Sequence, residues 1–112
     1  MNLTTLQQSD IGLSDEEMRL LIEALNRFGL KDVFVFGSRA KKTHKRGSDV
    51  DLAIFDNMSN DQAREIEYWL NEETLLPYYF DVVLYNEKLD SNLREHIDRV
   101  GLRLILLGWE FF

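Results

Sequence analysis

Two short apolar runs, residues 33–36 and 50–55, lie on either side of a polar, basic segment and limit the folds open to this chain. The first run, VFVF, consists of β-forming residues and stops abruptly at Gly37-Ser38. In the second run, VDLAIF, apolar side chains alternate with Asp51 and Ala53, so that the two sets point to opposite faces. Both runs are predicted to be strands of one sheet.

Helix signals flank the two predicted strands. Ser14 with Glu17 is a capping-box pattern that opens a predicted helix over residues 14–28, and Ser59 with Gln62 opens another over residues 60–73. A third helix is predicted from residue 90 or 91 to about 100. A third strand is predicted over 79–84, and the tail 102–107 is predicted to be a fourth strand or an extended apolar segment.

The element order is therefore α-β-(α)-β-α-β-α-(β). It predicts an α+β domain in which helices pack in two layers on a small mixed β-sheet. We expect residues 1–112 to form one domain with its core over about 14–107. The connection between the first two strands allows a helical crossover or a long hairpin, so their relative direction stays open.

Charge and composition exclude several functional classes. The chain has no cysteine, which excludes disulfides and thiolate metal sites. It shows no signal peptide and no apolar run long enough to cross a bilayer, so we expect a cytoplasmic protein without membrane contact. A formal net charge of −7 argues against a large nucleic-acid footprint. Five of the 13 Lys and Arg residues nevertheless fall within the basic loop, residues 39–46.

Gly37-Ser38 is the first candidate site. Glycine permits close backbone approach, and the free N–H groups of a helix start together with the Ser38 hydroxyl form an anion site. The same pair is also common as an ordinary turn with an N-cap serine. Gly-Ser alone therefore does not decide between a phosphate site and a turn.

Three aspartates form the second candidate site. Asp49 and Asp51 point to the same face of the second strand, about 6.5–7 Å apart, which raises a pKa or requires a cation such as Mg²⁺. If the third strand lies beside the second, Asp81 is about 4.8 Å away laterally. Three such carboxylates fit a site for two Mg²⁺ or Mn²⁺ ions. The alternative for each aspartate is an exposed, solvated strand carboxylate.

The combined spacing is more specific than its parts. Gly-Ser is followed by ten residues and then Asp-x-Asp, and each motif lies at a predicted strand end. With GSRA at 37–40, SDVDLAI at 48–54 and DVV at 81–83, the chain resembles the nucleotidyltransferase superfamily of DNA polymerase beta, over about residues 30–107. Its size resembles the minimal nucleotidyltransferase branch, the MNT-type antitoxins. Family members often carry glycine where Lys41-Lys42 stand here.

The resemblance implies a nucleotidyltransferase fold and specific roles. Gly37 and Ser38 would hold the triphosphate of ATP, while Asp49, Asp51 and Asp81 would be catalytic and would bind the metal ions. Apart from the resemblance, Arg39 or Lys42 is a candidate for nucleotide binding, by offsetting charge on the leaving pyrophosphate, and the alternative is a basic side chain that is only solvated. The implied reaction transfers AMP, or another nucleoside monophosphate, to a hydroxyl. The implied partner is a helical HEPN-type toxin whose tyrosine accepts the nucleotide, so that the chain acts as an antitoxin.

Two other functions fit the same residues. The chain could neutralise a partner by stoichiometric contact without catalysis, although a pure binder would not need three clustered carboxylates. It could also modify RNA, which the acidic composition disfavours.

Overall fold

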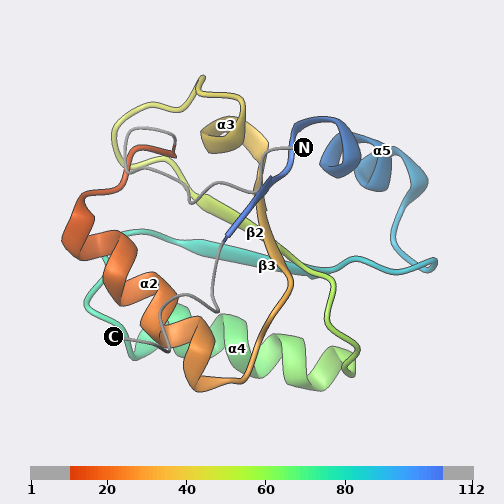
Figure 1. Ribbon diagram of the computed structural model, residues 1–112, viewed down its shortest axis with the longest axis horizontal. Coiled ribbons are helices and arrows are strands. Elements are labelled where there is room, and N and C mark those ends of the chain that lie inside the picture. Colours follow the sequence, from red (N-terminus) through yellow and green to blue (C-terminus); the bar gives the residue numbers. More distant parts are fainter. Residues whose placement is uncertain (1–10, 105–112) are drawn as a thin grey trace.

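The computed structural model describes residues 11–104 and contains four helices and a four-stranded sheet within that range (Figure 1). The bounds of the elements, in chain order, are α2 Asp15–Arg27, β1 Val33–Phe36, α3 Gly37–Ala40, β2 Val50–Ile54, α4 Asn60–Glu72, β3 Phe80–Leu84, α5 Ser91–Val100 and β4 Leu102–Arg103. The α+β fold with a mixed sheet is thus confirmed. The expected tail strand is confirmed only for β4, since residues 105–107 lie outside the described range.

The strand order is β3-β2-β1-β4. β1 runs antiparallel to both β2 and β4, whereas β2 and β3 run parallel. The relative direction of β1 and β2, which the sequence left open, is therefore antiparallel. Residues 37–49 form a long hairpin connection rather than a helical crossover. Because β2 and β3 are parallel neighbours, residues that begin these two strands meet at the same end of the sheet.

α2 and α4 cover one face of the sheet and enclose the main core (Figure 1). Both helices begin with the predicted capping boxes, at Ser14 with Glu17 and at Ser59 with Gln62. Their apolar stripes pack against the even-numbered residues of β2, all three of which are fully buried. Ile11 and Leu13 join this core from before the expected start at residue 14.

The opposite face carries α5 and the short helix α3 (Figure 1). A small apolar cluster centred on Phe36, Ala53 and Ile97 joins α5 to the sheet. Near the starting ends of β2 and β3, Asp51 is half-buried and Asp81 is exposed. None of the helices in the range 11–104 has the length and apolar character that crossing a bilayer requires.

Candidate active site

The sheet brings two of the predicted carboxylates into direct register. Asp51 of β2 and Asp81 of β3 are paired residues in the parallel ladder, on the face opposite α2 and α4. Asp49 lies just before β2 and is exposed, and Asp51 is half-buried. The lateral neighbour relation expected for Asp81 is therefore present.

Gly37 lies directly against the Asp51 carboxylate. It has φ +74° at the start of α3, directly after β1, and Phe36 pairs with Asp51 in the antiparallel ladder. A Cβ atom at Gly37 would lie 2.1 Å from Oδ2 of Asp51, so only glycine leaves room for that carboxylate. The predicted phosphate-binding residue and the predicted metal ligand thus form one site.

Ser38 follows Gly37 in the first turn of α3 and is half-buried. Its carbonyl oxygen accepts a hydrogen bond of 2.9 Å from the backbone N–H of Thr43, which folds the start of the basic loop back onto the helix. The Gly37-Ser38 turn is therefore fixed in place beside Asp51, while Lys41, Lys45 and Arg46 extend into solvent.

The electrostatics of the carboxylates are unfavourable when the site holds no cation. Partial burial raises the pKa of Asp51 to about 6, with further contributions from the charges of Asp81 and Asp49, while Arg39 acts in the opposite direction. Desolvation, and next the charge of Glu67, also raise the pKa of Asp81. The chain holds negative charge here at a cost in stability, which is a common property of functional sites.

These donors suit a hard divalent cation that arrives with a nucleotide. Among residues 11–104, no three acidic or histidine side chains lie close enough together to coordinate one ion by themselves. Mg²⁺ is commonly bound through one or two carboxylates plus substrate phosphates and water. Asp51 and Asp81, with the Gly37-Ser38 turn beside them, fit that open arrangement. The number of ions stays a prediction.

Arg39 occupies a different place from the one expected of a phosphate ligand. Its side chain is only 1% exposed. The guanidinium donates to the carbonyl oxygens of Ser48 and Ile11, and its Cζ lies 4.7 Å from the centroid of the Tyr78 ring. No contact in the described structure supports the phosphate role, because these donors are turned into the protein.

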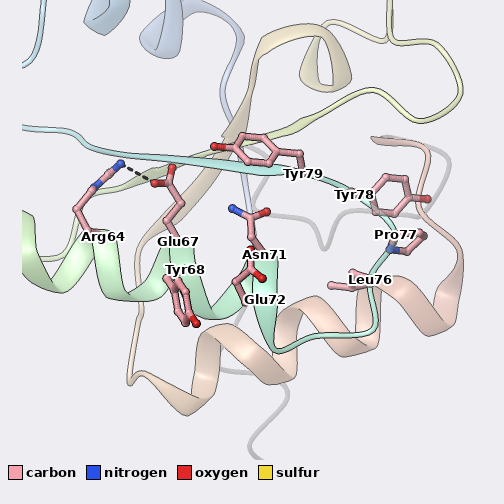
Figure 2. Close-up of a pocket in the computed structure, with 9 residues that line it drawn as sticks. All are labelled: Arg64, Glu67, Tyr68, Asn71, Glu72, Leu76, Pro77, Tyr78 and Tyr79. Atoms are coloured by element: carbon pink, nitrogen blue, oxygen red, sulfur yellow. Dashed lines mark hydrogen bonds and ion pairs between the residues drawn. The ribbon is translucent and has the colours of Figure 1, made fainter.

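The outer edge of β3 is closed by side chains from α4, as Figure 2 shows. Asn71 pairs with both the N–H and the carbonyl of Phe80, at 2.7 and 2.9 Å. Glu67 accepts from the N–H of Val82 at 2.9 Å, and Arg64 donates to the carbonyl of the same residue. Arg64 also pairs with Glu67 at 2.7 Å. This clamp holds the peptide groups on either side of Asp81.

Glu67 is the residue near the site that sequence reasoning missed. It lies four residues after Ala63 and directly after Ile66, at the border of the apolar stripe of α4. That border position was the available signal, because it turns a side chain toward the neighbouring strand. The Arg64 and Glu67 spacing could equally have been an ordinary surface ion pair.

Comparison with known proteins agrees with this geometry. The family model described as "Polymerase beta, Nucleotidyltransferase" matches residues 20–106. A search of curated proteins gave no match to this sequence.

Solved structures provide a likeness of fold. A crystal structure of a toxin-antitoxin with AMP-PNP is 23% identical, covers 77% of this chain and 70% of its own, and superposes with a TM-score of 0.63. The toxin-antitoxin MntA-HepT is 19% identical, covers 80% of this chain and 70% of its own, and gives a TM-score of 0.59. The family match spans most of the sequence and includes every residue of the site. The chain therefore belongs to the polymerase beta nucleotidyltransferase family.

Proposed function

We propose that this nucleotidyltransferase domain uses divalent metal to transfer a nucleoside monophosphate, AMP from ATP in the first instance, to a hydroxyl group on a protein partner. One observation carries the proposal: the carboxylate of Asp51 lies directly against Gly37 and beside Asp81. A triphosphate held by the turn at Gly37 would thus meet the carboxylates without any rearrangement of the sheet.

We assign each residue of the site a role according to its position. Backbone N–H groups at Gly37 and Ser38, with the Ser38 hydroxyl, hold the β- and γ-phosphates. Asp49 and Asp51 would hold one Mg²⁺ or Mn²⁺ ion together with the triphosphate, and Asp51 and Asp81 would hold a second. Bound metal would neutralise charge on the phosphates and favour ionisation of the acceptor hydroxyl. Such sites act by positioning and charge neutralisation more than by covalent catalysis.

We assign the proton transfer to Asp81. In the reaction, the acceptor oxygen bonds to the α-phosphorus, the bond to the bridging oxygen breaks, and pyrophosphate leaves. The proton of the acceptor hydroxyl passes to a carboxylate. β3 lies on the far side of β2 from the Gly37 turn, and Asp81 is exposed, so an acceptor hydroxyl has access to it.

We further propose that the acceptor is a tyrosine of a HEPN-type helical toxin, and that the chain is an antitoxin of the minimal nucleotidyltransferase type. The support is indirect: structures with the same fold were solved as toxin-antitoxin pairs, one of them with an ATP analogue. The open position of Asp49 and Asp81 suits an acceptor delivered by another macromolecule.

The decisive test is transfer of label from [α-³²P]ATP to the partner toxin in Mg²⁺. Asp51→Asn should lower the rate at least about 100-fold, because losses of 10–100-fold already follow from changes next to metal ligands. Asp61→Asn removes an exposed carboxylate from the first turn of α4 and serves as the matched control. Its rate should stay within about twofold of the wild-type rate.

Two outcomes favour the alternative functions. If Asp51→Asn neutralises the toxin fully without labelling it, the chain acts by stoichiometric binding. If label goes to RNA rather than to protein, the RNA-directed function is correct.

A further inference from the structure

Arg39 is a buried cation that the proposed reaction does not use. Burying a guanidinium costs several kcal/mol unless its donors are satisfied. Here Nε and Nη2 both donate to the carbonyl of Ser48, at 3.1 and 2.8 Å, and Nη1 donates to the carbonyl of Ile11 at 2.6 Å. The ring of Tyr78 covers its face. Because each of its nitrogens donates a hydrogen bond, the guanidinium keeps the backbone segments that it contacts in fixed positions.

Arg39 holds Ser48, which follows the basic loop and precedes Asp49. Three hydrogen bonds of this segment are local: Thr43 N–H to the Ser38 carbonyl, Ser48 N–H to the Lys45 carbonyl, and Lys45 N–H to the Ser48 hydroxyl. The last two tie the loop only to itself. The paired hydrogen bonds from Arg39 tie Ser48, the residue before Asp49, back to the helix that contains Gly37-Ser38.

The same guanidinium reaches two other segments. Gly12, with φ +77°, lies against both the basic loop and Arg39: a Cβ there would be 2.2 Å from Nε2 of His44 and 3.0 Å from Nη1 of Arg39. The Tyr78 hydroxyl donates to Glu17 of the α2 capping box at 2.8 Å. Tyr78 also lies two residues before Phe80, at the entrance to β3. Segments that precede α2, β2 and β3 therefore meet at one buried charge.

We propose that Arg39 is a positioning residue of the nucleotidyltransferase site, which holds Ser48 so that Asp49 and Asp51 stay aligned with the Gly37-Ser38 turn. The inference rests on the proposed function for its effect on metal binding. Its structural part, the fixing of residues 43–49 by Arg39, stands without it. Lysine cannot replace this fork, because a single ammonium group cannot reach both carbonyls in the same geometry.

The first measurement is hydrogen exchange of the full chain in wild type, Arg39→Lys and Arg39→Met. We expect amides in residues 43–49 to exchange at least about tenfold faster in both variants, while α4 keeps its protection. Leu21→Ala weakens the main core without touching the loop and controls for general destabilisation. Faster exchange everywhere, or unchanged exchange at 43–49, would overturn the proposal.

The second measurement is Mn²⁺ affinity by electron paramagnetic resonance, with a non-hydrolysable ATP analogue present. We expect Arg39→Lys to bind Mn²⁺ about tenfold more weakly and Leu21→Ala to bind it as wild type does. Equal Mn²⁺ binding in Arg39→Lys and wild type contradicts the positioning role. Absence of Mn²⁺ binding by wild type itself contradicts the proposed function instead, and the exchange result still tests the loop contact.

Discussion

The two faces of the sheet are built for different purposes. Under α2 and α4, the strand residues are apolar and almost fully excluded from water. On the other face, α5 covers only a small apolar cluster, and carboxylates stand beside it. One strand serves both faces, since β2 presents Leu52 to the main core and Asp51 to the site. Because side chains alternate along β2, its core residues and its charged residue lie on opposite faces of the sheet.

This separation explains how a small domain tolerates an unfavourable site. A chain of 112 residues has only a few kcal/mol to spare, so clustered carboxylates need a well-packed core elsewhere. The core face supplies that stability and lies away from the carboxylates. On the other face, the apolar cluster lies next to the carboxylates. We therefore expect substitutions in the main core to lower stability without changing activity, and substitutions in the small cluster to lower both.

The largest expected effect on stability comes from the core face. Leu21→Ala removes a fully buried side chain and should lower the free energy of unfolding by about 3 kcal/mol, because it leaves a cavity. Its transfer activity per folded molecule should stay within about twofold of the wild-type activity at low temperature. Thermal unfolding followed by circular dichroism and a labelled-ATP assay measure the two quantities.

Ile97→Ala is the matched change on the site face. Ile97 is 2% exposed and packs with Phe36, next to Asp51, on the helix that contacts α3. We expect this variant to lose both stability and activity. If Leu21→Ala reduces the activity of the folded protein as much as Ile97→Ala does, the two faces are not functionally separate.

Gly37→Ala should have the next largest effect. Left-handed backbone costs an L-residue about 1–2 kcal/mol, and the added Cβ would collide with the Asp51 carboxylate. We expect a loss of more than about 2 kcal/mol in stability and loss of nucleotide binding.

Gly29→Ala provides the control for that change. Gly29 has φ +71°, and a Cβ there meets nothing within 4 Å. Gly29→Ala should therefore lose only the stability that a left-handed backbone costs an L-residue. It should keep its affinity for ATP, measured by calorimetry. Equal losses of ATP affinity in the two variants would mean that contact with Asp51 is unimportant.

The smallest expected effect is a gain in stability. The pKa of Asp51 is about 6 in the folded chain and near its ordinary value of 3.8 when unfolded. Its protonated form therefore stabilises the fold fully below about pH 4, and this contribution is lost as the pH rises through 6. At pH 7 without metal, Asp51→Asn should be more stable by about 1 kcal/mol, after allowing for solvent screening of a half-exposed group.

Urea unfolding at pH 4.5 and pH 7 measures this difference. The gap between Asp51→Asn and wild type should widen with pH. Asp49→Asn is the comparison: Asp49 is exposed, so that variant should change stability less. A gap that narrows as the pH rises would contradict the assigned direction of the Asp51 pKa.

Much of this arrangement followed from local sequence signals. The capping boxes at Ser14 and Ser59 begin their helices where predicted, because such caps depend on residues three apart. The face of the sheet on which Asp51 lies was predicted from the alternation of side chains along one strand. Its pairing with Asp81 was expected on condition that the strands were neighbours, and the parallel pairing of β2 and β3 confirms it.

The features that the sequence did not reveal depend on distant segments. Arg39 is buried because the carbonyls of Ile11 and Ser48 and the ring of Tyr78 converge on it, and no local pattern indicates that meeting. When those partners are not known, an arginine among other basic residues is interpreted as a phosphate ligand. Glu67 was missed for the same reason, since its role depends on which strand α4 covers.

We expect the carboxylates beside Gly37 to form a cation site that bound nucleotide completes. The most direct test is a Mn²⁺ titration of wild type and Asp51→Asn, with and without a non-hydrolysable ATP analogue, followed by electron paramagnetic resonance. We predict that wild type binds Mn²⁺ at least about tenfold more tightly when the analogue is present, and that Asp51→Asn loses this gain. Equal Mn²⁺ affinity in the two proteins under both conditions would contradict the account.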